Sequence, residues 1–428
     1  MSKNPTQFDP VSQRRYVAPL FGVLLVFVLI SATTYAILAE THLTASITTN
    51  STQVTPTTAS LTGQESTAPE ASPLSSTAPA EVVSAGVVER PVGHFGIAVG
   101  QTLSGLSKAA LEAELDDLVG LGVGWIRFDI DWSEIQPYDS DHYNWRNIDR
   151  IVAAAEARDM QLVATLSYTP QWARMEYCTS SKCAPADPWQ FARFAKEAVH
   201  RYAPQGVQYW EIWNEPNLVS FWKPEPDVGD YTLLLQVSYN AIKSEDEKAI
   251  VISGGLGPIA TENGNIAPLT FVRELYDQEG GEYFDALGFH PYTFPVPPSY
   301  TKVWSAWSQM SATNPSLRSI MTAHGDAEKK IWLTEFGAPT GGPGTLATLS
   351  NYTRVQQPSY VTEELQAHML TEALILAEEY EWAGPLFWYS YKDLGTSTDT
   401  IENFFGLLRF DGSKKPAYIA LQEIFNVQ

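Results

Sequence analysis

Two glutamates lie at the ends of apolar runs that have the length of a buried strand. Glu215 lies within Glu-Ile-Trp-Asn-Glu-Pro-Asn (residues 211–217), and Glu335 lies within Ile-Trp-Leu-Thr-Glu-Phe-Gly (331–337). Either carboxylate alone could equally well be a helix cap or a solvated loop acid. Together they form the pair that cleavage of a glycosidic bond requires, because one group protonates the leaving oxygen while the other attacks the anomeric carbon.

The elements that would position these glutamates are strands that alternate with amphipathic helices from about Pro91 onward. In the helix predicted at 145–158, for example, Ile148, Ile151 and Val152 share one face. Strands separated by helices pair in parallel and are covered by those helices. The eight predicted strands are His94–Val99, Gly124–Ile130, Gln161–Ser167, Val207–Asn214, Ala249–Ser253, Phe284–His290, Lys330–Phe336 and Pro385–Tyr391.

Eight such units predict an α/β fold, a (β/α)8 TIM barrel over residues 92–428. A doubly wound open sheet is the alternative, but the GxGxxG turn that would favour it does not follow the first strand. The catalytic side chains of a barrel come from the C-terminal ends of its strands. Glu215 and Glu335 should therefore face each other across the barrel mouth at about 5–5.5 Å, the separation found in retaining glycosidases.

The residues around both glutamates resemble those of clan A glycoside hydrolases. Trp213-Asn-Glu-Pro216 looks like the strand-four signature of that clan, and the sequence around Glu335 is similar to its strand-seven nucleophile motif. The resemblance covers nearly all of residues 92–426 and is greatest to family 39, with its endo-acting, membrane-tethered exopolysaccharide hydrolases. Further positions that match the clan's residues around the cleaved sugar are Arg127, His290, Tyr292 and Trp388.

The resemblance implies a role for each residue that carries chemistry. Glu215 would be the acid/base, and Glu335 the nucleophile. Asn214 would bind the sugar 2-hydroxyl, a contact that strengthens in the transition state. Tyr292 would orient an ionised Glu335. A neighbouring cation would lower the pKa of Glu335, whereas the pKa of Glu215 must be raised for proton donation.

Three further side chains are assigned to the same site. Arg127 points inward on a strand, where an unpaired charge is costly, so it should pair with Glu335 or with another inward acid such as Glu211. His290 would support the acid/base, or else be a structural histidine. Trp388 is expected to form the floor beneath the sugar, and its neighbour Tyr389 to be packing.

Loops after strands two and three supply weaker candidates for the cleft wall. Trp132, Tyr168 and Trp172 are predicted to bind substrate, although many clan members carry a histidine near the position of Tyr168. Cys178 and Cys183 follow on the same rim. A zinc site would need two more ligands, so the alternatives are a short-loop disulfide and free thiols, and an oxidising compartment favours the disulfide.

The first 91 residues predict an anchor and a stalk. Residues 16–39 contain no charged side chain and would form a helix of about 36 Å, enough for a hydrocarbon core of about 30 Å. Arg14 and Arg15 precede this run, so residues 1–15 are predicted to be cytoplasmic and the remainder extracytoplasmic, at the cell surface or in the periplasm. Residues 40–91 are rich in Ser, Thr, Pro and Ala and predict a disordered stalk. The alternative is a signal peptide cleaved after Ala36 or Ala39, which would release a secreted protein.

The composition of the chain limits the classes of ligand that it can be expected to bind. A net charge of −22 argues against nucleic acid, whose phosphates require a basic surface. No cofactor or metal is expected, because the seven histidines are scattered. The expected partner is a polysaccharide or oligosaccharide, bound by a monomeric catalytic domain.

Endo action is favoured, because family 39 xylosidases carry an added β-rich domain for which the sequence leaves no room after strand eight. An exo-acting β-glycosidase resembling those xylosidases and an inactive carbohydrate-binding barrel are the alternatives.

Overall fold

The computed structural model describes residues 94–353 and 360–425 and shows a closed barrel of eight parallel strands. Each strand pairs with its neighbour in sequence, and β8 closes the barrel by pairing with β1. The predicted eight-stranded α/β barrel is therefore confirmed. The strands are β1 (Phe95–Gly100), β2 (Trp125–Asp131), β3 (Gln161–Ser167), β4 (Tyr209–Asn214), β5 (Ile250–Gly255), β6 (Ala286–Phe289), β7 (Lys330–Phe336) and β8 (Ala383–Tyr389).

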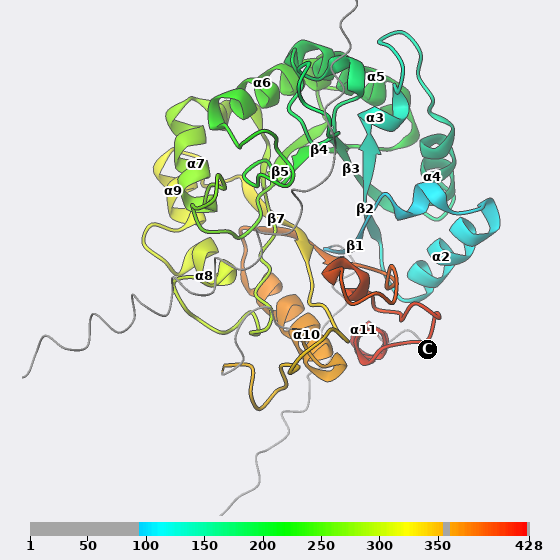
Figure 1. Ribbon diagram of the computed structural model, residues 1–428, viewed down its shortest axis with the longest axis vertical. Coiled ribbons are helices and arrows are strands. Elements are labelled where there is room, and N and C mark those ends of the chain that lie inside the picture. Colours follow the sequence, from blue (N-terminus) through cyan, green and yellow to red (C-terminus); the bar gives the residue numbers. More distant parts are fainter. Residues whose placement is uncertain (1–93, 354–359, 426–428) are drawn as a thin grey trace, which may run out of the picture. The chain divides into compact units, whose positions relative to one another are not determined.

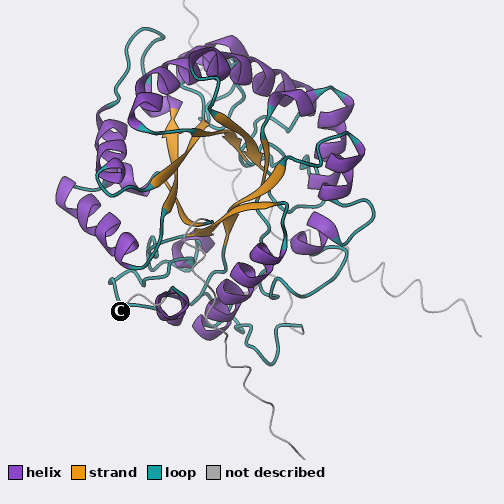
Figure 2. Ribbon diagram, turned by 180° about the vertical axis from the view of Figure 1, so that it is seen from behind, coloured by secondary structure: helices purple, strands orange, loops and turns teal. Residues whose placement is uncertain are grey.

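Helices surround the strands on the outside, as Figures 1 and 2 show. The α-helices are α2 (Lys108–Gly120), α3 (Trp132–Ile135), α4 (Arg146–Glu156), α5 (Pro188–Tyr202), α6 (Val228–Glu245), α7 (Pro268–Asp277), α8 (Ala306–Ser311), α9 (Leu317–Ala323), α10 (Glu363–Glu379) and α11 (Pro416–Ile424). Short 3-10 helices are η1 (Thr102–Gly105), η2 (Gln171–Ala173), η3 (Ala203–Gln205), η4 (Gly280–Tyr283) and η5 (Ile401–Phe404).

Helix α5 illustrates why these segments fold as they do. The Asp187 side chain accepts a hydrogen bond from the backbone of Trp189 at the helix N-terminus, and Pro188 occupies the first helical position. Phe191 and Phe194 lie on its buried face. The N-terminal cap and the apolar face thus both favour a helix over these residues, and the apolar face packs against the barrel.

The side chains inside the barrel change from aromatic to charged along the barrel axis. Successive side chains of a strand point to opposite faces, so Trp125, Arg127 and Asp129 of β2 lie on the same, inward face. Trp125 packs edge-to-face against Trp332 of β7, with ring centroids 5.8 Å apart. Aromatic rings thus fill the N-terminal end, and charged groups follow toward the C-terminal end.

No helix within residues 94–353 and 360–425 is long and apolar enough to span a membrane. The predicted cytoplasmic tail (1–15), membrane span (16–39) and stalk (40–91) lie outside the described residues.

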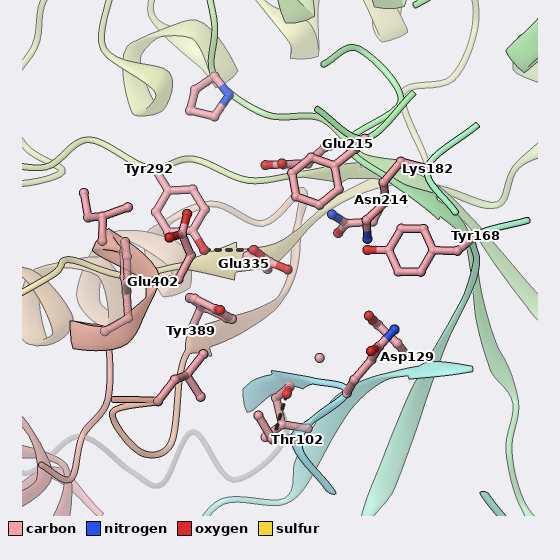
Figure 3. A pocket seen from close by; sticks show the side chains of 18 of the residues that line it. Thr102, Asp129, Tyr168, Lys182, Asn214, Glu215, Tyr292, Glu335, Tyr389 and Glu402 are labelled. Atoms are coloured by element: carbon pink, nitrogen blue, oxygen red, sulfur yellow. Dashed lines mark hydrogen bonds between the residues drawn. The ribbon is translucent and has the colours of Figure 1, made fainter. Parts of the chain in front are cut away.

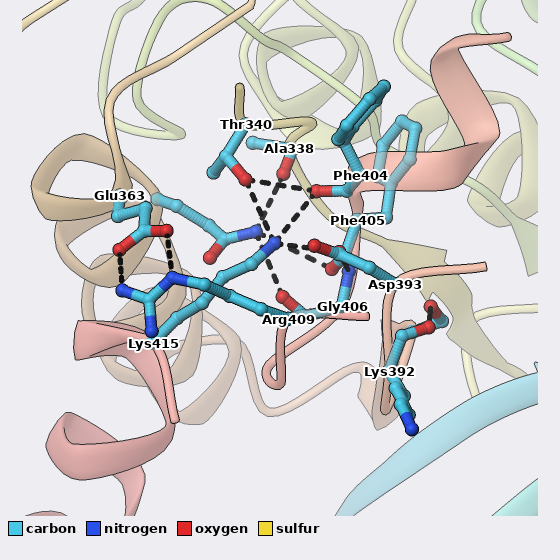
Figure 4. A network of polar contacts seen from close by, with 12 residues as sticks. Ala338, Thr340, Glu363, Lys392, Asp393, Phe404, Phe405, Gly406, Arg409 and Lys415 are labelled. Carbon is cyan, nitrogen blue, oxygen red and sulfur yellow. Dashed lines mark hydrogen bonds and ion pairs between the residues drawn. The ribbon is translucent and has the colours of Figure 1, made fainter. Parts of the chain in front are cut away.

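A buried lysine holds the long loop between β8 and α11 in place (Figure 4). Lys415 Nζ donates hydrogen bonds to Asp393 Oδ1 at 2.7 Å, to Thr340 Oγ1 at 2.8 Å and to the Phe404 carbonyl at 3.1 Å. Asp393 Oδ1 also accepts a hydrogen bond from the backbone of Gly406 at 2.8 Å. Lys415 is 1% exposed and Asp393 is 7% exposed, so each of these buried charges is neutralised by the other.

Replacing Lys415 with methionine should destabilise the protein by about 3–5 kcal/mol, because Asp393 would remain buried without a cation. The double variant Lys415→Met/Asp393→Asn should recover part of this loss, since asparagine is neutral and still accepts the Gly406 hydrogen bond. Urea denaturation of the three proteins measures the free energies of unfolding. Equal stability of wild type and Lys415→Met would show that the ion pair does not hold this loop.

Candidate active site

A cavity of about 760 Å³ opens at the C-terminal ends of the barrel strands. Both predicted glutamates, Glu215 and Glu335, lie on its wall, together with Asn214, Tyr168 and Tyr292 (Figure 3). These side chains follow or end strands β3, β4, β6 and β7. The barrel therefore brings together residues that are more than 160 positions apart in the sequence, Tyr168 and Glu335.

His290 lies between the two glutamates. Its Nδ1 is 3.0 Å from Glu215 Oε1 and 3.6 Å from Glu335 Oε2. These carboxylate oxygens are therefore at most about 6.6 Å apart, the sum of the two distances. This limit is compatible with the 5–5.5 Å expected from the sequence.

Arg127 joins three acceptors with one guanidinium group and is 1% exposed. Its Nε donates to Glu211 Oε2 at 2.6 Å, its first terminal nitrogen to Glu335 Oε1 at 2.6 Å, and its second to Asn214 Oδ1 at 2.8 Å. The expected pairing with Glu335 or Glu211 is thus found with both. Because the guanidinium can only donate, it also fixes the orientation of the Asn214 amide.

Glu335 has a pKa below its ordinary value. Burial by itself raises the pKa of this carboxyl, but the charges of His290 and Arg127 together with hydrogen bonds from Tyr292 and Arg127 outweigh burial. The Tyr292 hydroxyl donates to Glu335 Oε2 at 2.8 Å. Glu335 is therefore held as an oriented carboxylate.

Glu215 is shifted in the opposite direction. Burial raises the pKa of Glu215, and the nearby Glu335 raises it further, whereas His290 counteracts these effects only in part. A proton is therefore retained more readily on Glu215 than on Glu335.

The position of His290 depends on a glycine of the neighbouring strand. The ring is fully buried, and a Cβ atom on Gly255 of β5 would collide with its Nε2. Among the described residues, Nε2 has no hydrogen-bond partner, so the ring's polar contacts are made through Nδ1. Glu335 and Glu215 raise the pKa of His290 against the effect of burial, which favours the protonated ring between two acids.

The family model of the cellulases, glycosyl hydrolase family 5, matches residues 92–366. The chain belongs to this family. Its membership in the glycoside hydrolases of clan A, expected from the strand-four and strand-seven motifs, is thereby confirmed.

The relatives of this family 5 protein include a β-xylosidase. A β-xylosidase of Geobacillus stearothermophilus is 30% identical over 124 residues, which cover 26% of this chain and 24% of that protein. The match thus spans about a quarter of the curated relative.

Solved structures with the same fold include several family 39 enzymes. A family 39 glycoside hydrolase of Bacteroides cellulosilyticus has a TM-score of 0.59 at 23% identity, covering 78% of this chain and 63% of that one. A family 39 β-xylosidase of Caulobacter crescentus has a TM-score of 0.54 at 21% identity, with coverages of 79% and 72%. Xylanase 10B of Thermotoga maritima has a TM-score of 0.52 at 18% identity, with coverages of 78% and 94%. These identities are low and show the shared fold.

The predicted residues of the family 5 site fall into two groups. Asn214, Tyr292 and Tyr168 line the cavity beside the glutamates. Arg127 and His290 are buried behind that wall and hold the carboxylates in place. Their contacts are with the glutamates, as expected from the sequence for the charge of Arg127 and for His290 beside the acid/base.

The assignment of Trp388 to the floor of the site is wrong. Trp388 is fully buried and packs edge-to-face against Phe336, with ring centroids 5.8 Å apart. Its neighbour Tyr389, expected to be packing, lines the cavity instead. Adjacent side chains of a strand point to opposite faces, so an assignment one residue off exchanges cavity for core.

Trp132 and Trp172 are also misplaced by the sequence interpretation. Trp132 begins α3 and is fully buried, with its ring stacked on Phe194 of α5 at a centroid distance of 5.7 Å. Trp172 packs against Trp132 and donates its indole hydrogen to the Gln136 carbonyl at 2.7 Å. Trp132 is buried because the chain turns into α3 directly after β2, whereas Trp172 lies on η2 and is half-buried.

Cys178 and Cys183 form the predicted disulfide, with their Cα atoms 6.2 Å apart. The loop that they close presents Lys182 to the cavity. Lys182, Asp129 and Glu402 also line the cavity. Asp129 had a signal in the sequence, since it shares the inward face of β2 with Arg127. Lys182 lies on an irregular loop and Glu402 on the short 3-10 helix η5, and neither segment has a periodicity that indicates the direction of its side chains.

Replacing Tyr292 with phenylalanine should raise the pKa of Glu335, because one hydrogen bond to the charged carboxylate is lost. The titration of Glu335 can be followed by NMR of protein labelled at the glutamate carboxyl carbons, with the Glu335→Gln variant providing the assignment. Tyr389→Phe is the matched control: this phenol lines the same cavity, but among the described residues no hydrogen bond joins it to Glu335. A titration that is unchanged in Tyr292→Phe, or raised equally in both variants, would contradict the role of Tyr292.

Proposed function

We propose that this protein is a retaining glycoside hydrolase that cleaves β-glycosidic bonds of a polysaccharide, with Glu335 as the nucleophile and Glu215 as the acid/base. The observation that carries the proposal is the position of the Glu215 and Glu335 carboxyl groups on either side of the buried His290 ring. The pKa values of the two groups are shifted in opposite directions, which agrees with this assignment. Family membership supports the reaction class, and the short separation of the carboxyl groups supports retention.

In the first step, Glu335 attacks the anomeric carbon and forms a glycosyl ester, while Glu215 gives its proton to the departing glycosidic oxygen. In the second step, Glu215 takes a proton from water. The water oxygen attacks the same carbon, and the Glu335 carboxylate is released. Two displacements on opposite faces of the sugar leave the anomeric configuration unchanged.

Asn214 is oriented to assist the first step. Its Oδ1 accepts the hydrogen bond from Arg127, so its amide nitrogen is left to donate into the cavity. A hydrogen bond from this nitrogen to the sugar 2-hydroxyl would strengthen as positive charge develops at the anomeric carbon. Arg127 thus positions both the nucleophile and the group that binds the neighbouring hydroxyl.

Glu335→Gln should lower kcat/KM by several orders of magnitude for every substrate, because no carboxylate remains to attack. Glu215→Gln should cost least for nitrophenyl glycosides, whose leaving group needs little protonation. Glu402→Gln is the matched control, an exposed acid on the same cavity, and should cost at most about a few-fold. Proton NMR of the first product should show the substrate's anomeric configuration. An inverted first product would exclude the double displacement.

We propose further that the enzyme cuts within a polymer. A second cavity of about 310 Å³ shares Gln101, Gly105 and Asp129 with the main one, so the cleft continues beyond the glutamates. A continuous cleft can hold several sugar units, as an endo-acting enzyme requires. The alternative is exo action, favoured by the similarity to β-xylosidases.

Time courses on xylan, mannan, β-glucan and bacterial exopolysaccharide should distinguish the two modes. Endo action predicts that oligosaccharides of intermediate length appear before monosaccharide. Sizing of reducing-end-labelled products at low conversion measures this order, and Glu335→Gln provides the blank. Monosaccharide as the sole early product would show exo action and place a block at one end of the cleft.

A further inference from the structure

Lys182 and Asp129 are oppositely charged side chains on one wall of the cavity, and Figure 3 shows Tyr168 between them. Lys182 Nζ lies 2.9 Å from the centre of the Tyr168 ring and 5.0 Å from that of Phe221. Within residues 94–353 and 360–425, neither the ammonium group nor the Asp129 carboxylate has a hydrogen bond or ion pair, although Asp129 is only 9% exposed.

The neighbouring acids differ in this respect. Asp131 accepts hydrogen bonds from Gln101 and Ser133, and Glu335 accepts them from Arg127 and Tyr292. Burying a charge without a polar partner is costly. Burial raises the pKa of Asp129 to about 7 and lowers the pKa of Lys182 to about 8. A ligand that offered hydrogen bonds to both groups would remove this cost.

The chemistry of the pair selects a ligand with donors and acceptors side by side. An ammonium group can only donate, and an ionised carboxylate can only accept. A sugar hydroxyl does both, so two hydroxyl groups of one sugar ring satisfy the pair. A uronate is disfavoured, because Glu215 and Glu335 lie on the same wall and the chain has a net charge of −22. An amino sugar is disfavoured by Lys182 itself.

We propose that Lys182 and Asp129 form a clamp that binds two hydroxyl groups of one neutral sugar unit and thereby selects among sugars. This proposal rests on the proposed function: Lys182 and Asp129 would determine the sugar specificity of that same site. Asp129 belongs to both cavities, so the clamped unit lies where the two cavities join. The disulfide holds the lysine there, because Lys182 precedes Cys183 and its carbonyl accepts a hydrogen bond from the backbone of Lys223 at 2.9 Å.

The clamp can be tested by calorimetric binding in the Glu335→Gln background, where the ligand is not consumed. The probes are xylotetraose, cellotetraose, mannotetraose and, as the anionic case, tetragalacturonate. Lys182→Met and Asp129→Asn should each weaken the best neutral ligand by about 10- to 100-fold. The double variant should lose less than the product of the two single losses, because both groups hold one sugar. Lys108→Met, an exposed lysine on α2, should change nothing.

Selectivity separates a clamp from a merely structural role. The ratio of dissociation constants between the best and the worst neutral tetrasaccharide should shrink in both single variants, and Lys182→Arg should restore part of it. Circular dichroism of each variant checks that it is folded.

Three results would overturn the clamp: unchanged affinity and selectivity in the folded variants, binding of none of the neutral tetrasaccharides, or tighter binding of tetragalacturonate that depends on Lys182. Full hydrolytic activity of Glu335→Gln would instead overturn the proposed mechanism, while its binding data would still test the clamp.

Discussion

The site depends on one buried guanidinium group. Arg127 of β2 bonds to Glu211 and Asn214 of β4 and to Glu335 of β7, and so ties three strands together across the barrel interior. A buried cation must be fully paired, and these acceptors are what the barrel offers at that depth. Glu211 also accepts hydrogen bonds from the Thr165 hydroxyl and from the backbone of Gly255, so its carboxylate has polar partners without substrate. Glu335 can therefore change its charge during a reaction while Arg127 keeps an anionic partner.

The difference between the two glutamates follows from this arrangement. Both are buried and both approach His290, but only Glu335 also receives hydrogen bonds from Arg127 and Tyr292. Burial therefore dominates the pKa of Glu215, while favourable charges and donors dominate that of Glu335. Two identical side chains acquire opposite protonation preferences from their surroundings, as acid and nucleophile require.

The glutamates and the rim of the cavity are held in place by different means. Strand ends position the glutamates, whereas loops carry Lys182 and Glu402 to the rim. The Cys178–Cys183 disulfide closes one of these loops, and the buried Lys415–Asp393 pair holds the other. The residues proposed to cleave the bond lie at strand ends, whereas the proposed clamp pairs a loop residue, Lys182, with a strand residue, Asp129.

The sequence by itself predicted the eight-stranded barrel, the two glutamates as a pair at strand ends, and the polar residues beside them. These features could be predicted because strand periodicity and short motifs are local properties. Glu215 and Glu335 each end an apolar run, and the strand-four and strand-seven motifs are contiguous. The anchor at 16–39 stays a prediction. Tertiary structure alone decided which neighbour faces the cavity: Tyr389 does and Trp388 does not, because the pleat reverses direction at every residue. It also decided that Trp132 packs against α5, and that Lys182 and Asp129 line the same cavity. Such contacts join separate βα units, and no local pattern encodes a direction across that distance.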